Sequence, residues 1–229
     1  MKRLVITIDG PGGSGKSTLA RALAERLSYV YLDTGAIYRV VALASQEASR
    51  GWCDQGSVAD VARDIVARKR LRFERDTDGT QRVVLDDHDV SAAIRTPEMS
   101  AGASTVSAFP AVRQELLQLQ RDLGADGGVV VEGRDTGTVV FPNADVKFFM
   151  HASPEERARR RFEELRAKKM RVTFEDTLRE LNERDKRDTE RQAAPLVRAH
   201  DAVDIDTTNV SIEQVLQMLA ERVEARSRG

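Results

Sequence analysis

The chain lacks most of the features that tie a protein to a membrane, an oxidising compartment or a nucleic acid. Its single cysteine, Cys53, cannot form a disulfide within the chain, which fits a reducing cytosol. No apolar run approaches the roughly 18 residues that cross a bilayer, and the short apolar run near the start ends at Asp9, unlike a signal peptide. The 36 basic and 37 acidic residues leave a net charge of −1, which argues against an extended nucleic-acid surface. We therefore expect a cytoplasmic globular protein that binds neither membrane nor nucleic acid.

Short apolar runs alternate with amphipathic segments along most of the chain. Five of these runs have the continuous pattern of parallel strands that are covered on both faces; they are residues 4–8, 29–32, 129–131, 146–150 and 203–205. Leu19, Leu23 and Leu27 recur every four residues, as in an amphipathic helix, and residues 113–123 and 212–223 behave similarly. This alternation predicts an α/β fold with a central five-stranded parallel sheet flanked by helices. The polar tail, residues 224–229, is expected to fray.

One stretch departs from this pattern. Residues 71–90 alternate between apolar and polar, and Asp78-Gly79 has the composition of a hairpin turn. We interpret residues 63–98 as a small antiparallel β insertion, so that residues 1–62 and 99–229 form the core domain.

The strongest motif follows the first predicted strand. It matches G-x-x-x-x-G-K-[ST] and reads Gly10-Pro11-Gly12-Gly13-Ser14-Gly15-Lys16-Ser17. Backbone N–H groups of such a loop, together with the N-terminus of the following helix, bind polyphosphate. Lys16 can reach the β- and γ-phosphates, and the Ser17 hydroxyl can ligate Mg²⁺. The alternative, a glycine-rich turn with an incidental lysine, is disfavoured by the strand–loop–helix context. The motif therefore predicts a site for a nucleoside triphosphate over these residues and Thr18.

The rest of the sequence narrows the classes of P-loop protein to which this chain could belong. The guanine-reading N-K-x-D of GTPases does not occur in the sequence. A transporter or motor ATPase would need a larger chain or further assembly motifs. A small kinase remains, with its second substrate expected at the carboxyl ends of the strands.

Four further stretches carry a resemblance to a known family. They are residues 32–39 (LDTGAIYR), 103–113 (ASTVSAFPAVR), 132–142 (EGRDTGTVVFP) and 183–196 (ERDKRDTERQAAPL). With the phosphate loop they resemble, in order from about residue 4 to residue 213, the bacterial cytidylate kinases of the P-loop nucleoside monophosphate kinase superfamily. Two positions depart from the family pattern: Thr34 replaces a frequent serine, and Glu132 replaces a frequent aspartate, which leaves the contact made by Glu132 open.

The resemblance implies the architecture and the reaction. The fold would be that of a P-loop NTPase, with residues 63–98 as the nucleoside-monophosphate-binding insertion and a helical lid at about residues 155–172. The chain would transfer the γ-phosphoryl group of ATP, with Mg²⁺, to CMP or dCMP in pyrimidine nucleotide metabolism, acting as a monomer.

The resemblance also implies the site residues. Arg39, Arg134, Arg184 and Arg191 would bind the acceptor phosphate, and the last three would share catalysis with Lys16. Ser104, Arg113 and Asp135 would select the base. The remaining contacts would come from Thr34 in the acceptor loop, from Asp188 at the ribose, and from the lid residues Arg157, Arg160 and Arg161 at the triphosphate.

Structural alternatives to these roles stay open at this point. The lid arginines could form a solvated helix face paired with Glu156 and Glu164, and the phosphate-binding arginines could form surface ion pairs. Asp135 could form an ion pair at a strand end or assist the metal, and Thr34 and Ser104 could cap helices. We expect Asp9 to order the phosphate loop.

Alternative functions also stay open. The chain could be a kinase for another monophosphate, such as UMP or dTMP, or a module that uses ATP as a switch without transferring phosphate. Nucleic-acid binding through the arginine-rich segment would predict strongly salt-dependent affinity for oligonucleotides.

Overall fold

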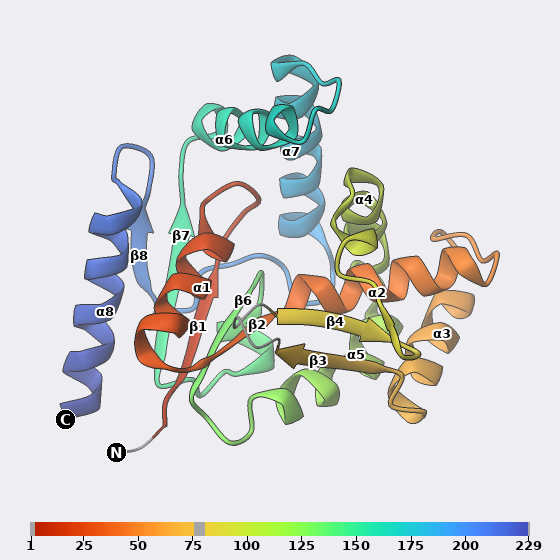
Figure 1. Cartoon of the computed structure of the whole chain (residues 1–229), viewed down its shortest axis with the longest axis horizontal. Helices are drawn as coiled ribbons and strands as arrows, with labels where there is room; N and C mark the ends of the chain where they lie inside the picture. The colour runs from red at the N-terminus through yellow and green to blue at the C-terminus, as the bar shows by residue number, and fades with distance from the viewer. Residues whose placement is uncertain (1–2, 76–80, 229) are drawn as a thin grey trace. The chain divides into compact units, whose positions relative to one another are not determined.

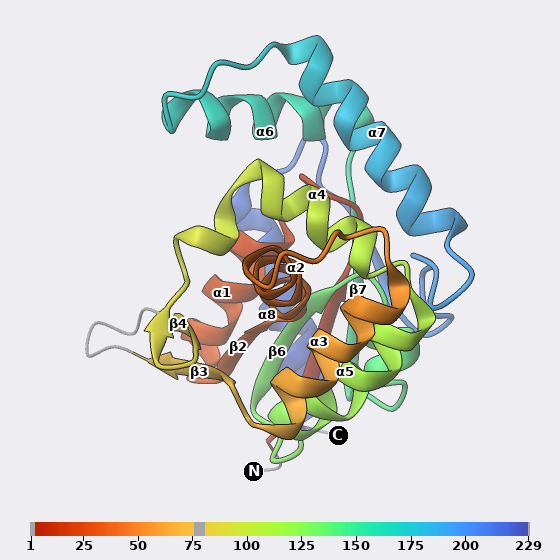
Figure 2. The ribbon, with the colours of Figure 1, turned by 90° about the vertical axis from the view of Figure 1, so that its right-hand side faces the viewer.

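The chain folds into two compact units (Figures 1 and 2). The computed structural model describes residues 3–75 and 81–228. One unit comprises the chain up to Leu32 and from Gly124 onward, and the second comprises Asp33–Leu123. The predicted hairpin turn at Asp78-Gly79 lies outside the described residues.

The first unit is built on a parallel sheet with the strand order β2-β6-β1-β7-β8. Its strands are β1 (Val5–Asp9), β2 (Val30–Asp33), β6 (Val129–Gly133), β7 (Val146–His151) and β8 (Val203–Asp206). The five-stranded parallel sheet is confirmed, because each strand overlaps one of the predicted apolar runs. The edge strand β8 is covered less than expected: Ile205 is buried, whereas Asp204 and Asp206 on either side of it are exposed.

Some helices of this unit pack on the sheet, and others follow its strands in the chain. They are α1 (Lys16–Leu27), the single π-helical turn η2 (Thr136–Val140), α6 (Pro154–Ala167), α7 (Phe174–Glu190) and α8 (Ile212–Arg228). α1 and α8 pack on one sheet face, where Leu23, Phe148 and Leu219 share an apolar core. The prediction that the tail frays is wrong for residues 224–228, since α8 continues through them and Arg228 pairs with Glu224.

Local capping defines the helix–loop–helix segment formed by α6 and α7. Ser153 precedes α6 and accepts a hydrogen bond from the Glu156 N–H, and Thr173 does the same for the Asp176 N–H at the start of α7. These side chains satisfy N–H groups that have no partner within the helix. The expected helix, loop and second helix over residues 157–191 are therefore present, and α6 follows the carboxyl end of β7 (Figure 1).

The second unit combines helices with an antiparallel sheet of order β3-β4-β5. Its elements are α2 (Thr34–Glu47), α3 (Gln55–Ala67), β3 (Leu71–Arg75), β4 (Gln81–Leu85), β5 (His88–Asp89), the 3₁₀ turn η1 (Ala93–Arg95), α4 (Pro97–Val106) and α5 (Pro110–Leu123). Ile37, Val58 and Leu116 lie in its fully buried core. The antiparallel strands fall within residues 63–98, but residues 63–67 belong to α3, and the compact unit extends well beyond that segment on both sides.

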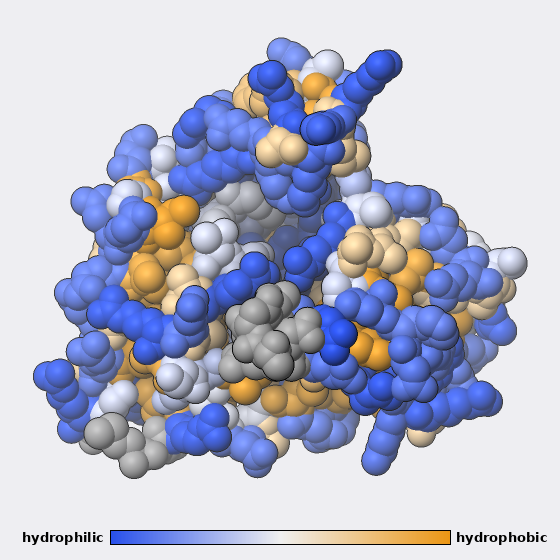
Figure 3. All heavy atoms as spheres, viewed as in Figure 1, coloured by the Kyte–Doolittle hydropathy of each residue, from blue (hydrophilic) through white to orange (hydrophobic). Residues whose placement is uncertain are grey.

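The surface of the molecule on the face of Figure 3 is mostly hydrophilic, and its apolar residues show as separate patches. Within residues 3–75 and 81–228, no helix combines the length and the apolar character that a membrane span requires.

Candidate active site

The loop between β1 and α1 has a backbone that only glycine fits at two positions. Gly10 has φ +148°, and a Cβ there would lie 1.9 Å from the Met150 carbonyl oxygen. Gly13 has φ +75°, and a Cβ there would lie 2.8 Å from the carbonyl oxygen of Arg157. Side chains at these positions would force the loop away from β7 and α6. The glycines therefore fix the close packing of this loop and the start of α1.

Lys16 is the first residue of α1, and its ammonium group lies over its own loop. The side chain is buried; its Nζ donates to the Pro11 carbonyl oxygen at 2.7 Å and contacts the Ser14 hydroxyl at 3.4 Å. Burial, and then the positive charge of Arg134, lower the pKa of Lys16 to about 7. A polyanion in the loop would favour the charged form of this lysine and replace the Pro11 carbonyl as its partner.

Ser17, the predicted metal ligand, contacts a carboxylate of the central sheet. Its hydroxyl donates to Glu132 Oε2 at 2.8 Å, and the Tyr31 hydroxyl donates to Glu132 Oε1 at 2.6 Å. The motif resemblance left the contact of Glu132 open. The structure places this carboxylate, on β6, against the phosphate loop. Sequence reasoning missed Glu132 as a site residue, although its place at the carboxyl end of a buried strand was a signal.

The oxygen atoms of Ser17 and Glu132 suit a magnesium ion. Mg²⁺ prefers hard oxygen ligands and is held by one or two carboxylates together with substrate phosphates and water. In the part of the chain that the structure describes, no three His, Cys, Asp or Glu side chains gather in a metal-binding group. A magnesium ion here would therefore depend on Ser17, Glu132 and the oxygens of a bound nucleotide.

Asp9 ends β1 and is buried, but its role differs from the expected one. Its carboxylate accepts hydrogen bonds from the Thr136 N–H (2.9 Å), the Thr136 hydroxyl (2.8 Å) and the Gly137 N–H (2.7 Å). The described hydrogen bonds of Asp9 thus hold the η2 turn after β6 and not the phosphate loop. Burial raises the pKa of Asp9, although these hydrogen bonds oppose the shift.

Three of the four predicted acceptor-phosphate arginines come together in the first unit. Arg134 Nε donates to Asp188 Oδ2 at 2.9 Å, and Arg184 Nε lies 3.8 Å from the same oxygen. Arg191 donates to Asp135 Oδ1 at 3.1 Å, and both side chains are almost fully buried. Burial alone would raise the pKa of Asp188, but Arg134, Arg184 and Arg191 hold it below its ordinary value. Asp188 and Asp135 are buried, and Arg134 and Arg184 are partly buried, so these networks are not the surface pairs of the alternative interpretation.

This arginine cluster lies close to the phosphate loop. Arg134 and Arg184 both act on the pKa of Lys16, and a Cβ on Gly12 would lie 3.9 Å from a terminal nitrogen of Arg134. The ion pair of Asp135 with Arg191 agrees with the alternative interpretation of Asp135 as an ion-paired carboxylate. It leaves the predicted base-reading role a hypothesis.

Arg39, Thr34, Ser104 and Arg113 belong to the second unit. Arg39 pairs with Asp33 at 3.2 Å in a partly exposed position. The buried Arg113 donates to the Ser107 carbonyl oxygen at 3.3 Å, and its guanidinium carbon lies 5.4 Å from the centre of the Tyr38 ring.

Thr34 and Ser104 do not cap helices. Asp33 caps α2 by accepting from the Ala36 N–H at 3.0 Å, and Thr96 caps α4 by accepting from the Met99 N–H at 3.1 Å. Ser104 lies inside α4, seven residues after its start. Both side chains are buried, so the capping alternative is wrong and the predicted contact with CMP remains a hypothesis.

The predicted lid arginines divide into two groups. Arg157 is buried; it donates to the Gly12 carbonyl oxygen at 3.0 Å and pairs with Asp185 on α7. Arg160 donates to both oxygens of Thr207, whose hydroxyl in turn contacts the Ser14 carbonyl oxygen at 3.1 Å.

Arg161 instead pairs with Glu164 one turn later at 2.7 Å, and Arg160 also pairs with Glu156 at 2.8 Å. The interpretation as a surface helix face therefore fits Arg161, fits Arg160 in part and fails for Arg157.

The sequence was also compared with known protein families. A family model for cytidylate kinase matches residues 6–225. The chain belongs to the cytidylate kinase family. It is 52% identical over 225 residues to a cytidylate kinase of Syntrophotalea carbinolica, covering 98% of this chain and 94% of that one. A Bacillus subtilis cytidylate kinase is 44% identical over 227 residues, with 99% of both chains covered. This cytidylate kinase family member is therefore a phosphotransferase, and the resemblance drawn from its motifs is confirmed.

Among solved structures, an uncharacterized protein from Eubacterium ventriosum has a similar fold. The TM-score is 0.56 with 13% sequence identity, and the match covers 98% of this chain and 99% of that one. At this identity the likeness concerns the fold alone.

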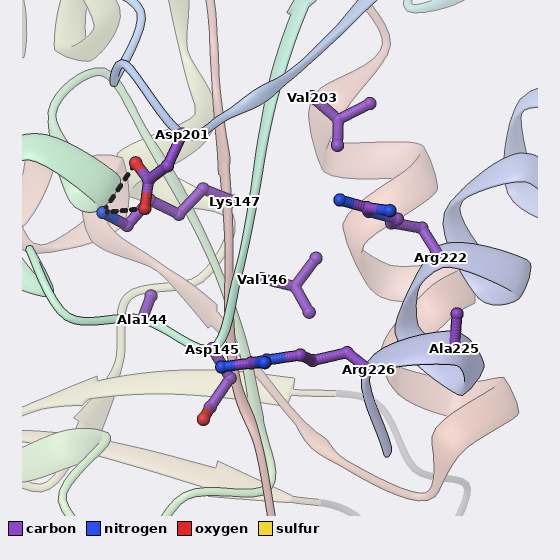
Figure 4. Close-up of a pocket in the computed structure, with 9 residues that line it drawn as sticks. All are labelled: Ala144, Asp145, Val146, Lys147, Asp201, Val203, Arg222, Ala225 and Arg226. Carbon is purple, nitrogen blue, oxygen red and sulfur yellow. Dashed lines mark hydrogen bonds and ion pairs between the residues drawn. The ribbon is translucent and has the colours of Figure 1, made fainter. Parts of the chain in front are cut away.

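A separate cavity of about 350 Å³ lies where β7 and β8 begin and α8 ends (Figure 4). Arg222 and Arg226 extend toward it from α8, and Lys147 on β7 is held by Asp201 at 3.0 Å. None of the predicted site residues lines it. Since β1 and β7 are parallel, this cavity is at the opposite end of the strands from the phosphate loop.

Proposed function

We propose that the chain catalyses transfer of the γ-phosphoryl group from MgATP to CMP or dCMP, giving ADP and CDP or dCDP. The observation that supports this best is the position of Arg134 beside the phosphate loop, where a Cβ on Gly12 would lie 3.9 Å from one of its terminal nitrogens, in a cluster with Arg184 around Asp188. A phosphate loop beside an arginine cluster has the groups needed to bring two phosphates together. The family relationship supports the pyrimidine monophosphate as the acceptor.

The arginines suit an acceptor that is itself a phosphate. Guanidinium groups stay protonated and bind phosphate oxygens in a bidentate geometry. Arg39, Arg134, Arg184 and Arg191 would neutralise the acceptor and align one of its oxygens with the γ-phosphorus. That oxygen already carries negative charge at neutral pH, so no general base is needed, unlike in kinases that act on alcohols. Catalysis would come from positioning and charge stabilisation.

Residues of the phosphate loop and α6 would hold the donor. The N–H groups of residues 10 and 12–18 would bind the phosphates, since Pro11 has none. Lys16 would bridge the β- and γ-phosphates, and Arg157, Arg160 and Arg161 would contribute charge from the lid. Ser17 and Glu132 would hold Mg²⁺, which when bound neutralises charge that develops between the β- and γ-phosphates.

Base selection would fall to Ser104, Arg113 and Asp135. A carboxylate suits the N4 amino group of cytosine, and an arginine suits its N3 and O2 acceptors. Uracil has an oxygen in place of N4, and a site built to bind an amino group rejects such an analogue strongly. Asp188 would contact the ribose hydroxyls. We place the enzyme in the cytoplasm as a monomer that takes part in pyrimidine nucleotide metabolism.

An ADP-release assay over CMP, dCMP, UMP, dTMP, AMP and GMP, with and without Mg²⁺, tests this proposal. We expect ADP only when Mg²⁺ and CMP or dCMP are both present, because the acceptor oxygen is supplied by the monophosphate. Lys16→Ala should abolish turnover while the far-UV circular dichroism is unchanged. Lys69→Ala, at an exposed lysine after α3, is the matched control and should retain the wild-type rate.

Three outcomes would contradict the proposal. Turnover of UMP or dTMP equal to that of CMP would indicate a kinase for another monophosphate. ADP release that is independent of any acceptor, or nucleotide binding without turnover, would indicate an ATP-dependent switch. Full activity of Lys16→Ala would rule out the proposed role of the phosphate loop.

A further inference from the structure

Glu132, which contacts Ser17, is also hydrogen-bonded by a second residue, Tyr31. Glu132 has its two carboxylate oxygens in separate hydrogen bonds: Oε2 accepts from the Ser17 hydroxyl at 2.8 Å, and Oε1 accepts from the Tyr31 hydroxyl at 2.6 Å. Tyr31 and Glu132 are each 5% exposed. The three side chains therefore form one hydrogen-bonded series from β2 through β6 to the start of α1.

The fold fixes the tyrosine in place. β2 lies next to β6 in the sheet, so Tyr31 approaches Glu132 from the neighbouring strand. Tyr31 belongs to the apolar core beneath α1 and α8, and the guanidinium carbon of Arg21 on α1 lies 5.3 Å from the centre of its ring. A buried ring held in this way presents its hydroxyl in one direction.

A glutamate needs such support more than an aspartate does. Its longer side chain has an additional rotatable bond, so the direction of its carboxylate is less restricted by the strand that carries it. A donor on one oxygen restricts the carboxylate and leaves the other oxygen directed at the hydroxyl of the loop. Partners of this kind orient the groups around a metal, and their removal commonly costs 10- to 100-fold in metal affinity or activity.

We propose that Tyr31 is a positioning residue that holds Glu132 in place for the metal–nucleotide complex at Ser17. The inference rests on the proposed Mg²⁺-dependent function. Tyr31 acts through Glu132 and touches neither the nucleotide nor the metal. Its hydroxyl sets how tightly the metal–nucleotide complex is held, while the phosphate loop and the arginine cluster keep their own contacts.

Metal titrations of matched variants test this role. Mn²⁺ binding is measured by electron paramagnetic resonance in the presence of a non-hydrolysable ATP analogue, for wild type, Tyr31→Phe, Glu132→Gln and the double variant. Tyr31→Phe keeps the ring and its packing and removes only the hydroxyl. Tyr29→Phe is the control, because the Tyr29 hydroxyl accepts a hydrogen bond from the Leu4 N–H at 3.2 Å, at the start of the chain.

We expect the Mn²⁺ dissociation constant to rise about 10-fold in Tyr31→Phe and to stay at the wild-type value in Tyr29→Phe. In the Glu132→Gln background, adding Tyr31→Phe should change it by less than about twofold, since coupled residues are not additive. In turnover assays, Tyr31→Phe should raise the Mg²⁺ concentration for half-maximal rate and leave kcat at saturating Mg²⁺ near that of wild type. Thermal unfolding identifies a variant that has lost its fold, and Glu132→Ala, which also removes the carboxylate, then replaces Glu132→Gln.

An unchanged Mn²⁺ dissociation constant in Tyr31→Phe would overturn the inference and leave the proposed function intact. An equal rise in the wild-type and Glu132→Gln backgrounds would overturn it as well, because Tyr31 would then not act through Glu132. A wild-type protein that binds no Mn²⁺ with the analogue would overturn both the metal dependence and the role of Tyr31.

Discussion

Lys16 is held in a position where its charge is unfavourable until a ligand arrives. Its ammonium group is buried, its near partner is the carbonyl oxygen of Pro11, and Arg134 and Arg184 add positive charge nearby. These surroundings lower its pKa from 10.5 to about 7. Glu132 and Asp9 oppose this shift only in part, and phosphate oxygens in the loop would add negative charge and move the pKa upward again.

Nucleotide binding should therefore take up a proton at alkaline pH. Above pH 7 the free protein holds Lys16 mostly neutral and the complex holds it charged, so ADP binding at pH 8 should take up about 0.9 proton at this residue, and at pH 6 only about 0.1. Between pH 7 and the raised pKa of the complex, the contribution of Lys16 to affinity should fall about tenfold per pH unit.

Calorimetric titration with ADP in buffers of different ionisation enthalpy measures this uptake. Lys16→Met is the reference, because it removes the titrating group and leaves the phosphate protonation of ADP itself. Equal proton uptake by wild type and Lys16→Met at pH 8 would contradict the assignment to Lys16.

For the candidate site, the sequence could predict which residues of the first unit lie near one another more completely than which atoms they contact. The phosphate loop is one contiguous segment with a fixed conformation, so Gly10, Gly13 and Lys16 could be placed from their order alone. The partners of Asp9 and Arg157 could not, since each pairs with a segment more than 100 residues away in sequence. Such contacts depend on the register of β1 against β6 and on the path of α6, which local patterns do not determine.

At the scale of elements, α6 is attached to both the phosphate loop and α7 through one buried arginine. Arg157 donates to the Gly12 carbonyl oxygen and pairs with Asp185, and its side chain is 6% exposed. Two residues later, Arg159 pairs with Glu156 and Glu163 on the exposed face of the same helix. These two arginines lie in the same helix but on opposite faces, because two residues turn an α-helix by about 200°, and this is why they differ in burial.

Arg157→Met should lower the free energy of unfolding by about 3 kcal/mol, because removing one partner of a buried ion pair leaves the other charge unpaired. Arg159→Met should leave stability nearly unchanged. The double variant Arg157→Met/Asp185→Leu should recover part of the loss, since both buried charges are then absent. Urea denaturation followed by circular dichroism measures all of these variants, and equal destabilisation by Arg157→Met and Arg159→Met would contradict the argument.

Elements with a clear period were predictable, and those set by tertiary contacts were not. The leucines of α1 and the apolar runs of the sheet follow directly from the pattern. The π-helical turn η2 has no such period and depends on hydrogen bonds to Asp9. Residues 224–228 lack apolar side chains apart from Ala225, yet they continue α8 with an Arg228–Glu224 pair and a Ser227 hydroxyl bond to the Val223 carbonyl oxygen.

At the scale of the whole molecule, the two units have separate apolar cores. One lies between the parallel sheet, α1 and α8, and includes Leu219; the other lies among α2–α5 and the antiparallel sheet, and includes Leu116. Both leucines are fully buried. Regions with separate cores open with different free energies and can be resolved by amide exchange.

Leu116→Ala should therefore speed amide exchange in Asp33–Leu123 and leave the other unit near its wild-type protection, and Leu219→Ala should do the reverse. Each truncation should cost about 2–5 kcal/mol in the unit that carries it, through lost burial and the cavity that remains. Hydrogen–deuterium exchange read by mass spectrometry assigns the change to peptides of one unit or the other. The two variants are matched in chemistry and burial, so a difference between them reflects the unit in which the residue lies. If each variant lowered protection equally in both units, the chain would open as a single cooperative unit, and the separation of the cores would have no energetic consequence.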